Sequence, residues 1–244
     1  MTPSDRESSE ALSLPSRRFR RISVGAFLGM LVLFVVAMPF LQGLSFGDLV
    51  VSGLLTLIMA SGVIMVGANR VTLVSAAVLA VPTVAAKWIN HYRPDLLPAS
   101  LYLLGGVLFL GFVMGHLLRF TLRAKRVSTD VLWAGIATYL VLGLLWTLAY
   151  LLAAQLVPDA FNLPGKAAPG QGINSFEALY FSFVTLSTMG YGDILPTASV
   201  TRMMAIVEAM TGVFFVSVLI ARLVALYTTE AALDGMSDDH GSPD

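Results

Sequence analysis

The chain has 244 residues, of which 57% are hydrophobic and 12% are charged, whereas soluble proteins carry roughly 25% charged residues. It contains no cysteine, which excludes disulfides and thiolate metal sites. The formal net charge is zero, so the charge balance gives no indication of a nucleic-acid partner.

Six apolar runs are long enough to cross a membrane as helices, since a helix needs about 20 mostly apolar residues to span the hydrocarbon core. The first run follows four arginines. It is longer than the apolar core of a signal peptide and lacks a small-residue cleavage pattern, so we expect an uncleaved helix. The sequence therefore predicts an all-α integral membrane protein with spans at about 22–41, 49–68, 71–87, 99–119, 131–157 and 198–228.

The distribution of Lys and Arg predicts how the chain is oriented in the membrane. With a cytoplasmic N-terminus, eleven of the 15 Lys and Arg residues lie on the inner side. The outer side then holds the other four, which are Lys87, Arg93, Lys166 and Arg202. This asymmetry predicts that both termini are cytoplasmic. Residues 1–21 are rich in Ser and Arg and are expected to form a disordered tail.

The segment between the fifth and sixth spans has two parts. Residues 158–173 contain Pro and Gly without an apolar period, which predicts an extracellular loop. Residues 174–187 are expected to form a short helix. Asn174 or Ser175 would cap this helix, and Glu177 falls in its first turn, where the helix dipole favours a negative charge. At about 14 residues it is too short to span the bilayer, so we expect it to enter the membrane and stop.

Directly after this helix comes the sequence Thr-Met-Gly-Tyr-Gly-Asp, residues 188–193. It resembles the selectivity filter of tetrameric potassium channels, in which rings of backbone carbonyls from four subunits replace the hydration shell of the ion. Gly190 and Gly192 permit the backbone conformations that direct successive carbonyls the same way, and Tyr191 would pack behind the filter. The resemblance implies ion-binding positions at Thr188, Met189, Gly190, Tyr191 and Gly192, with K⁺ held at the first four.

The resemblance extends to residues that would support the filter. Tyr180 occupies a position where many members of the family carry tryptophan, and it is placed to hydrogen-bond Asp193. The sequence departs from the usual pattern at Met189, where Val or Ile is common, but a backbone carbonyl rather than the side chain would face the ion. The expected support comprises Tyr180, Phe181, Asp193, the hydroxyl-bearing Thr185 and Ser187, and Glu208.

Glu208 is an ionisable residue inside an apolar span, which by default indicates a function. Two roles are open for it. Its carboxylate attracts cations below the filter, or it hydrogen-bonds the short helix from behind, and we prefer the second. Arg202 and Arg222, near the two ends of the same span, are expected to extend to the membrane interfaces.

The sixth span is expected, by the same resemblance, to line the inner pore. Gly212 falls 24 residues after Thr188, which matches the spacing of the family's gating-hinge glycine. Close helix packing is the alternative use of such a glycine. Ile220 and Val224 would form a hydrophobic gate that closes by dewetting. Steps of four along one helix face predict the pore-lining set Gly212, Val216, Ile220 and Val224.

Residues 22–126 form a four-helix membrane domain that lacks a conventional voltage sensor. A sensor carries Arg or Lys repeatedly within its fourth span, but residues 99–118 contain neither, and His116 is their sole ionisable side chain. No charge is expected within these four spans. The domain is a divergent sensor scaffold, a receptor for lipid or a small molecule, or packing that stabilises the tetramer. The short connection to the fifth span favours packing beside the domain's own pore helices.

These features together predict a subunit of a homotetrameric potassium channel in a prokaryotic plasma membrane, with a pore domain at 127–228 and K⁺ as permeant ion, without a cofactor. The acidic tail 229–244 is too short to fold as a domain, so gating would come through the membrane domain, lipid, pH or a separate regulatory partner. The alternatives are a potassium-uptake transporter subunit and a non-conducting sensor or accessory subunit. We do not expect an enzyme, because no nucleophile–base pair, metal cluster or phosphate loop is recognisable.

Overall fold

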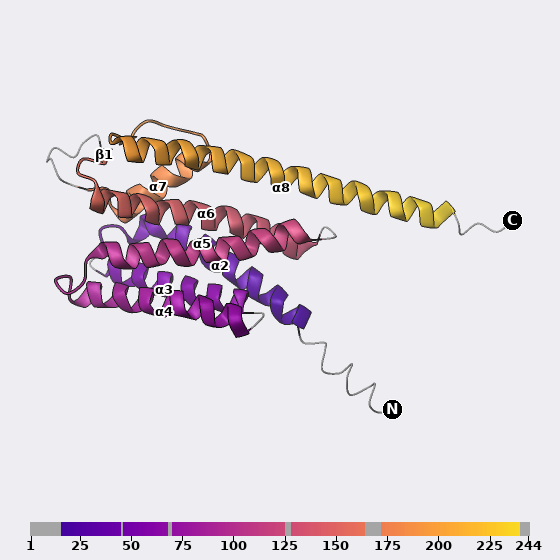
Figure 1. Ribbon diagram of the computed structural model, residues 1–244, viewed down its shortest axis with the longest axis horizontal. Coiled ribbons are helices and arrows are strands. Elements are labelled where there is room, and N and C mark those ends of the chain that lie inside the picture. Colours follow the sequence, from indigo (N-terminus) through magenta and orange to yellow (C-terminus); the bar gives the residue numbers. More distant parts are fainter. Residues whose placement is uncertain (1–15, 45, 68–69, 125–127, 164–171, 240–244) are drawn as a thin grey trace, which may run out of the picture.

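A computed structural model of the chain describes residues 16–44, 46–67, 70–124, 128–163 and 172–239, and these residues are mostly helical (Figure 1). Six of the described helices are long and apolar enough to cross a membrane. They are α2 (Ser16–Leu41), α3 (Gly47–Val66), α4 (Arg70–Tyr92), α5 (Ala99–Arg123), α6 (Thr129–Leu156) and α8 (Ser199–Asp239). The chain is therefore a multi-pass membrane protein of predominantly helical structure, as its apolar runs predict.

Two smaller features lie between α6 and α8. The short helix α7 (Ser175–Leu186) precedes the Thr-Met-Gly-Tyr-Gly-Asp segment. A two-residue antiparallel ladder joins β1 (Phe161–Asn162) to β2 (Leu195–Pro196). Residues 158–173, which are expected to form a loop, thus include the two-residue strand β1. A strand of two residues has no apolar alternation from which it could be predicted.

Contacts with the start of α8 fix this ladder in place. The Thr201 hydroxyl donates to the carbonyl oxygen of Ala160 at 2.9 Å, and the Thr197 hydroxyl donates to that of Asp159. The amide of Thr197 also donates to Ala160 O at 3.1 Å. The loop that follows α6 is thereby tied to the segment that leads into α8. Residues 164–171 of the same loop lie outside the described residues.

Several helices extend beyond the apolar runs that predict them. Helix α2 begins at Ser16, so residues 16–21 are helical rather than part of a disordered tail; residues 1–15 lie outside the described part of the chain. Helix α4 continues to Tyr92, which places Lys87 inside the helix rather than at its end. An apolar run marks only the part of a helix in contact with hydrocarbon, whereas the backbone hydrogen bonds continue through polar residues at the interface.

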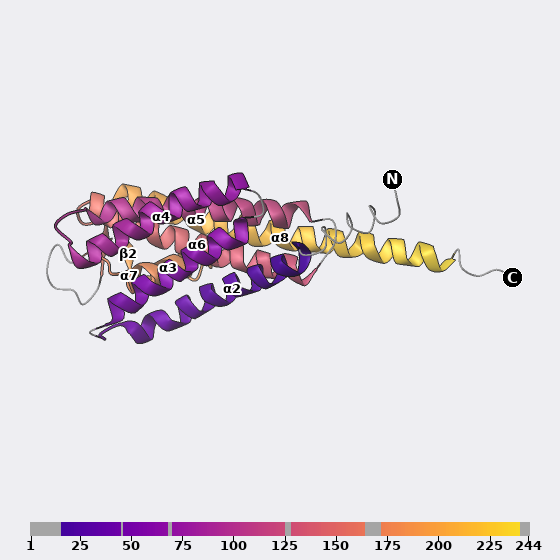
Figure 2. The same cartoon turned by 90° about the horizontal axis from the view of Figure 1, so that it is seen from below.

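Helix α8 is the longest element, with 41 residues. At a rise of 1.5 Å per residue it is roughly 60 Å long, about twice the hydrocarbon thickness of a bilayer. It continues past the ends of the other helices in both views (Figures 1 and 2). Residues 229–239, expected in a short tail, are therefore helical, and residues 240–244 lie outside the described residues. The first turn of α2 and the last turns of α8 lie at the same end of the bundle.

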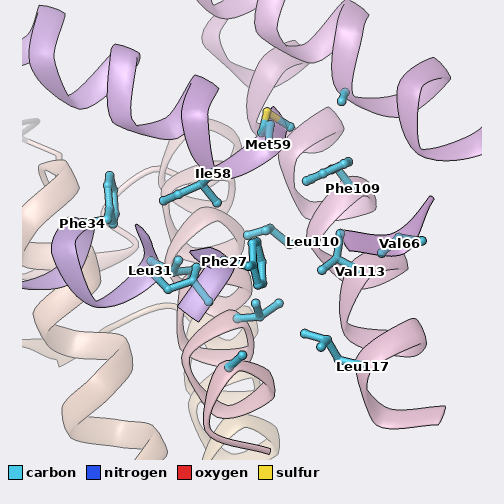
Figure 3. Packing of buried hydrophobic residues seen from close by; sticks show 14 of the residues in the cluster. Phe27, Leu31, Phe34, Ile58, Met59, Val66, Phe109, Leu110, Val113 and Leu117 are labelled. Carbon is cyan, nitrogen blue, oxygen red and sulfur yellow. The ribbon is translucent and has the colours of Figure 1, made fainter. Parts of the chain in front are cut away.

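The main apolar core lies between α2, α3 and α5 and continues onto α6 (Figure 3). Phe27 and Leu31 of α2 and Phe109 and Val113 of α5 are 0% exposed. On the α6 side the core includes Ala134, Ala137, Val141 and Leu144. Of the four N-terminal helices, α2 and α5 therefore pack against α6 of their own chain.

Helix α8 lies on the side of α6 opposite α3 and α4 (Figure 1). Its partners among the described elements are α6, α7 and β2. Half of the α6 span (50%) is buried inside the chain, compared with 11% of the α8 span. Most of the apolar surface of α8 is thus left without a partner in the described residues.

The core analysis predicts unequal effects for two adjacent substitutions in α5. Phe109→Ala should lower the free energy of unfolding by about 3–5 kcal/mol, because it leaves a cavity in the core. Leu108→Ala is the matched control, since Leu108 is 53% exposed and its loss leaves no cavity. Thermal unfolding of both variants in detergent measures the difference. Equal melting temperatures would show that this core does not hold the four helices together.

Candidate functional site

The start of α7 is fixed by a capping box. The amide of Glu177 donates to the Asn174 side chain at 2.9 Å, and the amide of Asn174 donates to the Glu177 carboxylate at 2.8 Å. These two bonds satisfy backbone donors that the first turn of a helix leaves free. Asn174 rather than Ser175 is therefore the cap.

The end of α7 leads directly into an irregular segment that bonds back to the helix. The amide of Thr188 donates to Thr185 O at 2.9 Å, and the amide of Met189 donates to Val184 O at 3.0 Å. The hydroxyl of Ser187 donates to a carbonyl of its own helix, Phe183 O, at 2.7 Å. The first residues of the segment are thus anchored on the last turn of α7.

The backbone of this segment alternates in the sign of φ. Thr188, Gly190 and Gly192 have φ values of 60°, 54° and 76°, whereas Met189 and Tyr191 are not among the residues with positive φ. Glycine adopts such values without steric cost. A β-branched residue such as Thr188 rarely does, and the left-handed conformation costs it about 1–2 kcal/mol. Sequence reasoning pointed to the two glycines and missed Thr188, because nothing in a threonine residue signals a left-handed φ.

One flank of the segment is held by aromatic stacking and a hydrogen bond. The ring of Tyr180 on α7 stacks on Tyr191, with 6.4 Å between centroids and 11° between planes. A side-chain hydrogen bond with Asp193, together with partial desolvation, raises the pKa of the Tyr180 phenol. Tyr180 therefore contacts both Tyr191 and Asp193 within one chain.

Phe181 points in a different direction from Tyr180. It is 7% exposed and packs edge-on against Tyr150 of α6 and Phe161 of β1, at centroid distances of 5.0 Å and 5.3 Å. Adjacent helix residues lie about 100° apart, so two neighbours cannot face the same surface. Phe181 thus anchors α7 to the interior of the chain, and Tyr180 contacts the irregular segment.

The other flank of the segment is open. Every residue from 187 to 193 is exposed, including Met189 at 62% and Tyr191 at 67%. A Cβ added at Gly190 or Gly192 would meet no atom within 4 Å. Within the described residues, this stretch of backbone therefore has an unoccupied face.

Glu208 lies behind α7 and is 0% exposed. Its Oε2 lies 2.5 Å from the Tyr150 hydroxyl on α6, and its Oε1 lies 2.6 Å from the Ser182 hydroxyl on α7. Ser182 Oγ is also 2.8 Å from the carbonyl oxygen of Gly143 on α6. This cluster joins α6, α7 and α8. Sequence reasoning identified Glu208 but missed Tyr150 and Ser182. Nothing in the sequence around these two residues indicates that they contact Glu208.

Two glycines allow the helices around α7 to approach closely. A Cβ at Gly212 of α8 would lie 2.2 Å from the carbonyl oxygen of Leu186, the last residue of α7. A Cβ at Gly143 of α6 would lie 2.6 Å from the Phe183 ring. The contact at Gly212 is with backbone and cannot be relieved by moving a side chain, so this position requires glycine, whereas at Gly143 the Phe183 ring would have to shift. Gly212 thus has a packing role, and α8 runs through it as one continuous helix.

The middle part of α8 is exposed along the face on which pore-lining residues are expected. Val216 is 40% exposed, and Ile220 and Val224 are each 57% exposed. Arg222, expected to extend to the membrane interface, instead donates to the carbonyl oxygen of Ala124 at 2.8 Å. Ala124 caps the C-terminus of α5, where carbonyls lack helical partners. Helix α8 is therefore tied at Arg222 to the end of the four-helix region.

The four-helix region contains an apolar cavity of about 80 Å³. It lies among α2 to α6, and Lys87 lines it with its ammonium group over the Tyr102 ring, 4.7 Å from the centroid. Asp48 of α3 is near enough to interact electrostatically with Lys87. The expectation that no charge lies within the first four spans is therefore wrong, because α3 and α4 include these two residues. Arg119 and Arg123 likewise lie within the last turns of α5.

Comparisons with known proteins agree on the C-terminal part of the chain. Residues 132–229 match the ion channel family. Two-pore potassium channel 4 of Arabidopsis thaliana is 40% identical over 89 residues, which are 36% of this chain and 30% of that protein. The chain thus spans less than a third of the length of this plant relative. No solved structure matches the chain.

Two microbial proteins extend the comparison. Protein LctB of Bacillus caldotenax is 32% identical over 125 residues, which are 48% of this chain and 92% of that protein. Probable potassium channel protein 2 of Methanocaldococcus jannaschii is 36% identical over 64 residues, which are 26% of this chain and 18% of that protein. The α2–α5 region lies outside the match to the ion channel family.

The close approach at Gly212 predicts that even one added methyl group is harmful. Gly212→Ala should destabilise the protein by about 1–3 kcal/mol, because the new Cβ must displace α7 or α8. Gly53→Ala in α3 is the control, since a Cβ there meets no atom within 4 Å, and alanine favours a helix over glycine by about 1 kcal/mol. Thermal unfolding in detergent should separate the two variants. An undiminished melting temperature for Gly212→Ala would contradict the packing role.

Proposed function

Because this chain belongs to the potassium channel family, we propose that it is one subunit of a homotetramer that conducts K⁺ passively across the membrane. The observation that carries the proposal is the alternation of left-handed φ angles at Thr188, Gly190 and Gly192. It is supported by the short capped helix before this segment and by the open face of the segment itself.

In the proposed filter, backbone carbonyl oxygens coordinate dehydrated K⁺. Alternating right- and left-handed residues turn successive N–H groups to one side of the backbone, so that successive carbonyls point to the other side. Four such segments around an axis would supply stacked rings of oxygens in place of the hydration shell. We assign K⁺ positions to Thr188, Met189, Gly190 and Tyr191, with Gly192 completing the filter.

The tetramer is proposed because one chain cannot form a closed ring of carbonyl oxygens. One chain supplies one filter segment, and a ring of carbonyls with closed four-fold symmetry needs four. The open face of residues 187–193 and the little-buried span of α8 are surfaces that such an assembly would use. Irregular backbone at membrane depth is tolerated only where it is buried in protein or lines water, which also favours assembly around these residues.

The filter would be supported from behind by α7 and its neighbours. Tyr180 stacks on Tyr191 and contacts Asp193, while Phe181 anchors the helix to the chain interior. Thr185 and Ser187 contribute through the turn that leads into the segment. Of the two roles open for Glu208, hydrogen bonding to α7 is favoured, because both carboxylate oxygens have partners and the residue is 0% exposed.

The inner pore would be lined by α8. The exposure of Val216, Ile220 and Val224 fits this role, and the last two are placed to form a gate that closes by dewetting. Gly212 contributes by close packing against α7. Its use as a hinge is a second interpretation, because α8 is unbroken at this position.

The region 22–126 is proposed as a membrane domain that lies beside its own pore domain, residues 127–228. Its support is the packing of α2 and α5 against α6 of the same chain. We place the protein in a prokaryotic plasma membrane with both termini cytoplasmic, as the Lys and Arg distribution predicts. Gating without a conventional voltage sensor would come through this domain, lipid, pH or a separate partner.

Two other functions have weaker support. A potassium-uptake subunit of the channel type would carry four pore loops in one chain, and this sequence contains one. A non-conducting sensor or accessory subunit would not need the left-handed glycines of an intact filter. An enzyme has no support from the comparisons, because residues 132–229 match an ion channel family.

Currents through the purified protein in planar bilayers test the proposal. Under a K⁺/Na⁺ gradient, the reversal potential should lie near that for K⁺. Gly190→Ala should abolish conduction or selectivity, because alanine resists the φ of 54°, and Tyr191→Asp should do the same by removing the stacked ring. Gly29→Ala is the control, since a Cβ there meets no atom within 4 Å.

Each result bears on a different part of the proposal. Reversal near zero for the wild type would contradict K⁺ selectivity, and unchanged selectivity in Gly190→Ala would contradict the filter assignment. Native mass spectrometry of the same preparation should show four chains. A monomer or dimer would contradict the tetramer.

A further inference from the structure

The buried cluster around Glu208 has more short oxygen–oxygen contacts than the hydroxyl protons of Tyr150 and Ser182 can fill, unless Glu208 also carries a proton. Ser182 Oγ lies 2.6 Å from Glu208 Oε1 and 2.8 Å from the carbonyl oxygen of Gly143. The carbonyl oxygen can only accept, and it accepts from the Thr147 hydroxyl as well. Ser182 has one proton, so it can donate to one of its two neighbours.

An ionised Glu208 would leave one of these short contacts without a proton. Two oxygens less than 3 Å apart with no hydrogen between them repel each other, and a buried environment strengthens the repulsion. A protonated Glu208 removes the conflict. Its hydroxyl donates to Ser182 Oγ, Ser182 donates to Gly143 O, and the Tyr150 hydroxyl donates to the remaining carboxyl oxygen.

The surroundings of Glu208 favour the same assignment. The residue is 0% exposed, and no Lys, Arg or His of the described residues lies within ion-pair distance of it. The titratable groups that face it are Tyr150 and Tyr139, both on α6, and α7 contributes the hydroxyl of Ser182. A buried carboxylate without a cation is costly, and protonation avoids that cost.

We propose that Glu208 is protonated at neutral pH and that it acts, with Tyr150 and Ser182, as a positioning residue for α7 and hence for the filter. The inference deepens the proposed function and rests on it for the link to conduction. The hydrogen-bond chain crosses three helices, from Tyr150 on α6 to Glu208 on α8, then to Ser182 on α7 and back to Gly143 on α6. Glu208 is the link in this chain that belongs to α8.

The proposal predicts a direction for pH dependence. The protonated form is present at neutral pH and is lost as the pH rises. Loss of the proton turns a donor into a second acceptor, so one of the two Ser182 contacts becomes repulsive, and α7 loses its link either to Glu208 of α8 or to Gly143 of α6. K⁺ selectivity should therefore decline at alkaline pH. Glu208→Gln keeps one donor and one acceptor and should remain selective over the same pH range.

Infrared spectroscopy of the full chain in lipid vesicles tests the proton directly and does not depend on conduction. At neutral pH the wild type should show a carbonyl-stretching band of a protonated carboxylic acid, and Glu208→Gln should lack it. Glu177→Gln is the matched control, because Glu177 is a capping residue at the outer end of α7, and its substitution should leave the band in place. A spectrum that does not change with Glu208→Gln would overturn the proposal.

A second variant keeps the test valid if Glu208→Gln does not fold. Tyr150→Phe removes the donor to the carboxyl carbonyl, so the same band should persist and move to higher frequency. An unmoved band would contradict the hydrogen-bond chain, and an absent band in folded protein would contradict protonation. If the band behaves as expected while bilayers show no K⁺ selectivity, the proton assignment stands and the proposed function fails.

Discussion

A stretch of backbone that presents its own carbonyl oxygens cannot also be bonded into a helix or a sheet. Residues 188–192 take this position in the proposed filter, and their backbone bonds to α7 and the stacking of Tyr191 on Tyr180 hold their conformation. The left-handed φ of Thr188 shows this constraint most clearly, because a β-branched residue rarely adopts such a φ. Helix α7 holds this backbone in place. Asn174 caps its N-terminal end, and its C-terminal end packs against Gly212 of α8. The packing of α6 and α8 around α7 serves the same end.

Sequence reasoning predicted the parts of this arrangement that have a local signature. Apolar runs gave the six spans, Asn174 and Glu177 have the spacing of a capping box, and the two filter glycines have a known conformational use. The remainder depends on contacts between distant parts of the chain. Tyr150 and Ser182 meet Glu208 from positions 58 and 26 residues away, and no local pattern predicts such a meeting. The β1–β2 ladder is missed for the same reason.

The four-helix region is coupled to the rest of the chain at two levels. Its core is continuous with α6, so the two cannot separate without exposing a shared apolar surface. At the C-terminal end of α5, Arg222 of α8 donates to the carbonyl oxygen of Ala124. Lys87 lines the cavity among these helices, with its ammonium group over the Tyr102 ring. The region therefore contains a charged group that its largely apolar spans do not suggest.

The contact between Gly212 and the carbonyl of Leu186 has a consequence for how such a protein can change over evolutionary time. Most helix contacts can drift, because one side chain grows as its neighbour shrinks and the spacing is kept. Here the spacing between α7 and α8 is set by backbone atoms, with no side chain to exchange. A replacement at this position cannot be compensated by a neighbour and must be absorbed by moving a helix. The position in α8 that carries no side chain is therefore one at which change is costly.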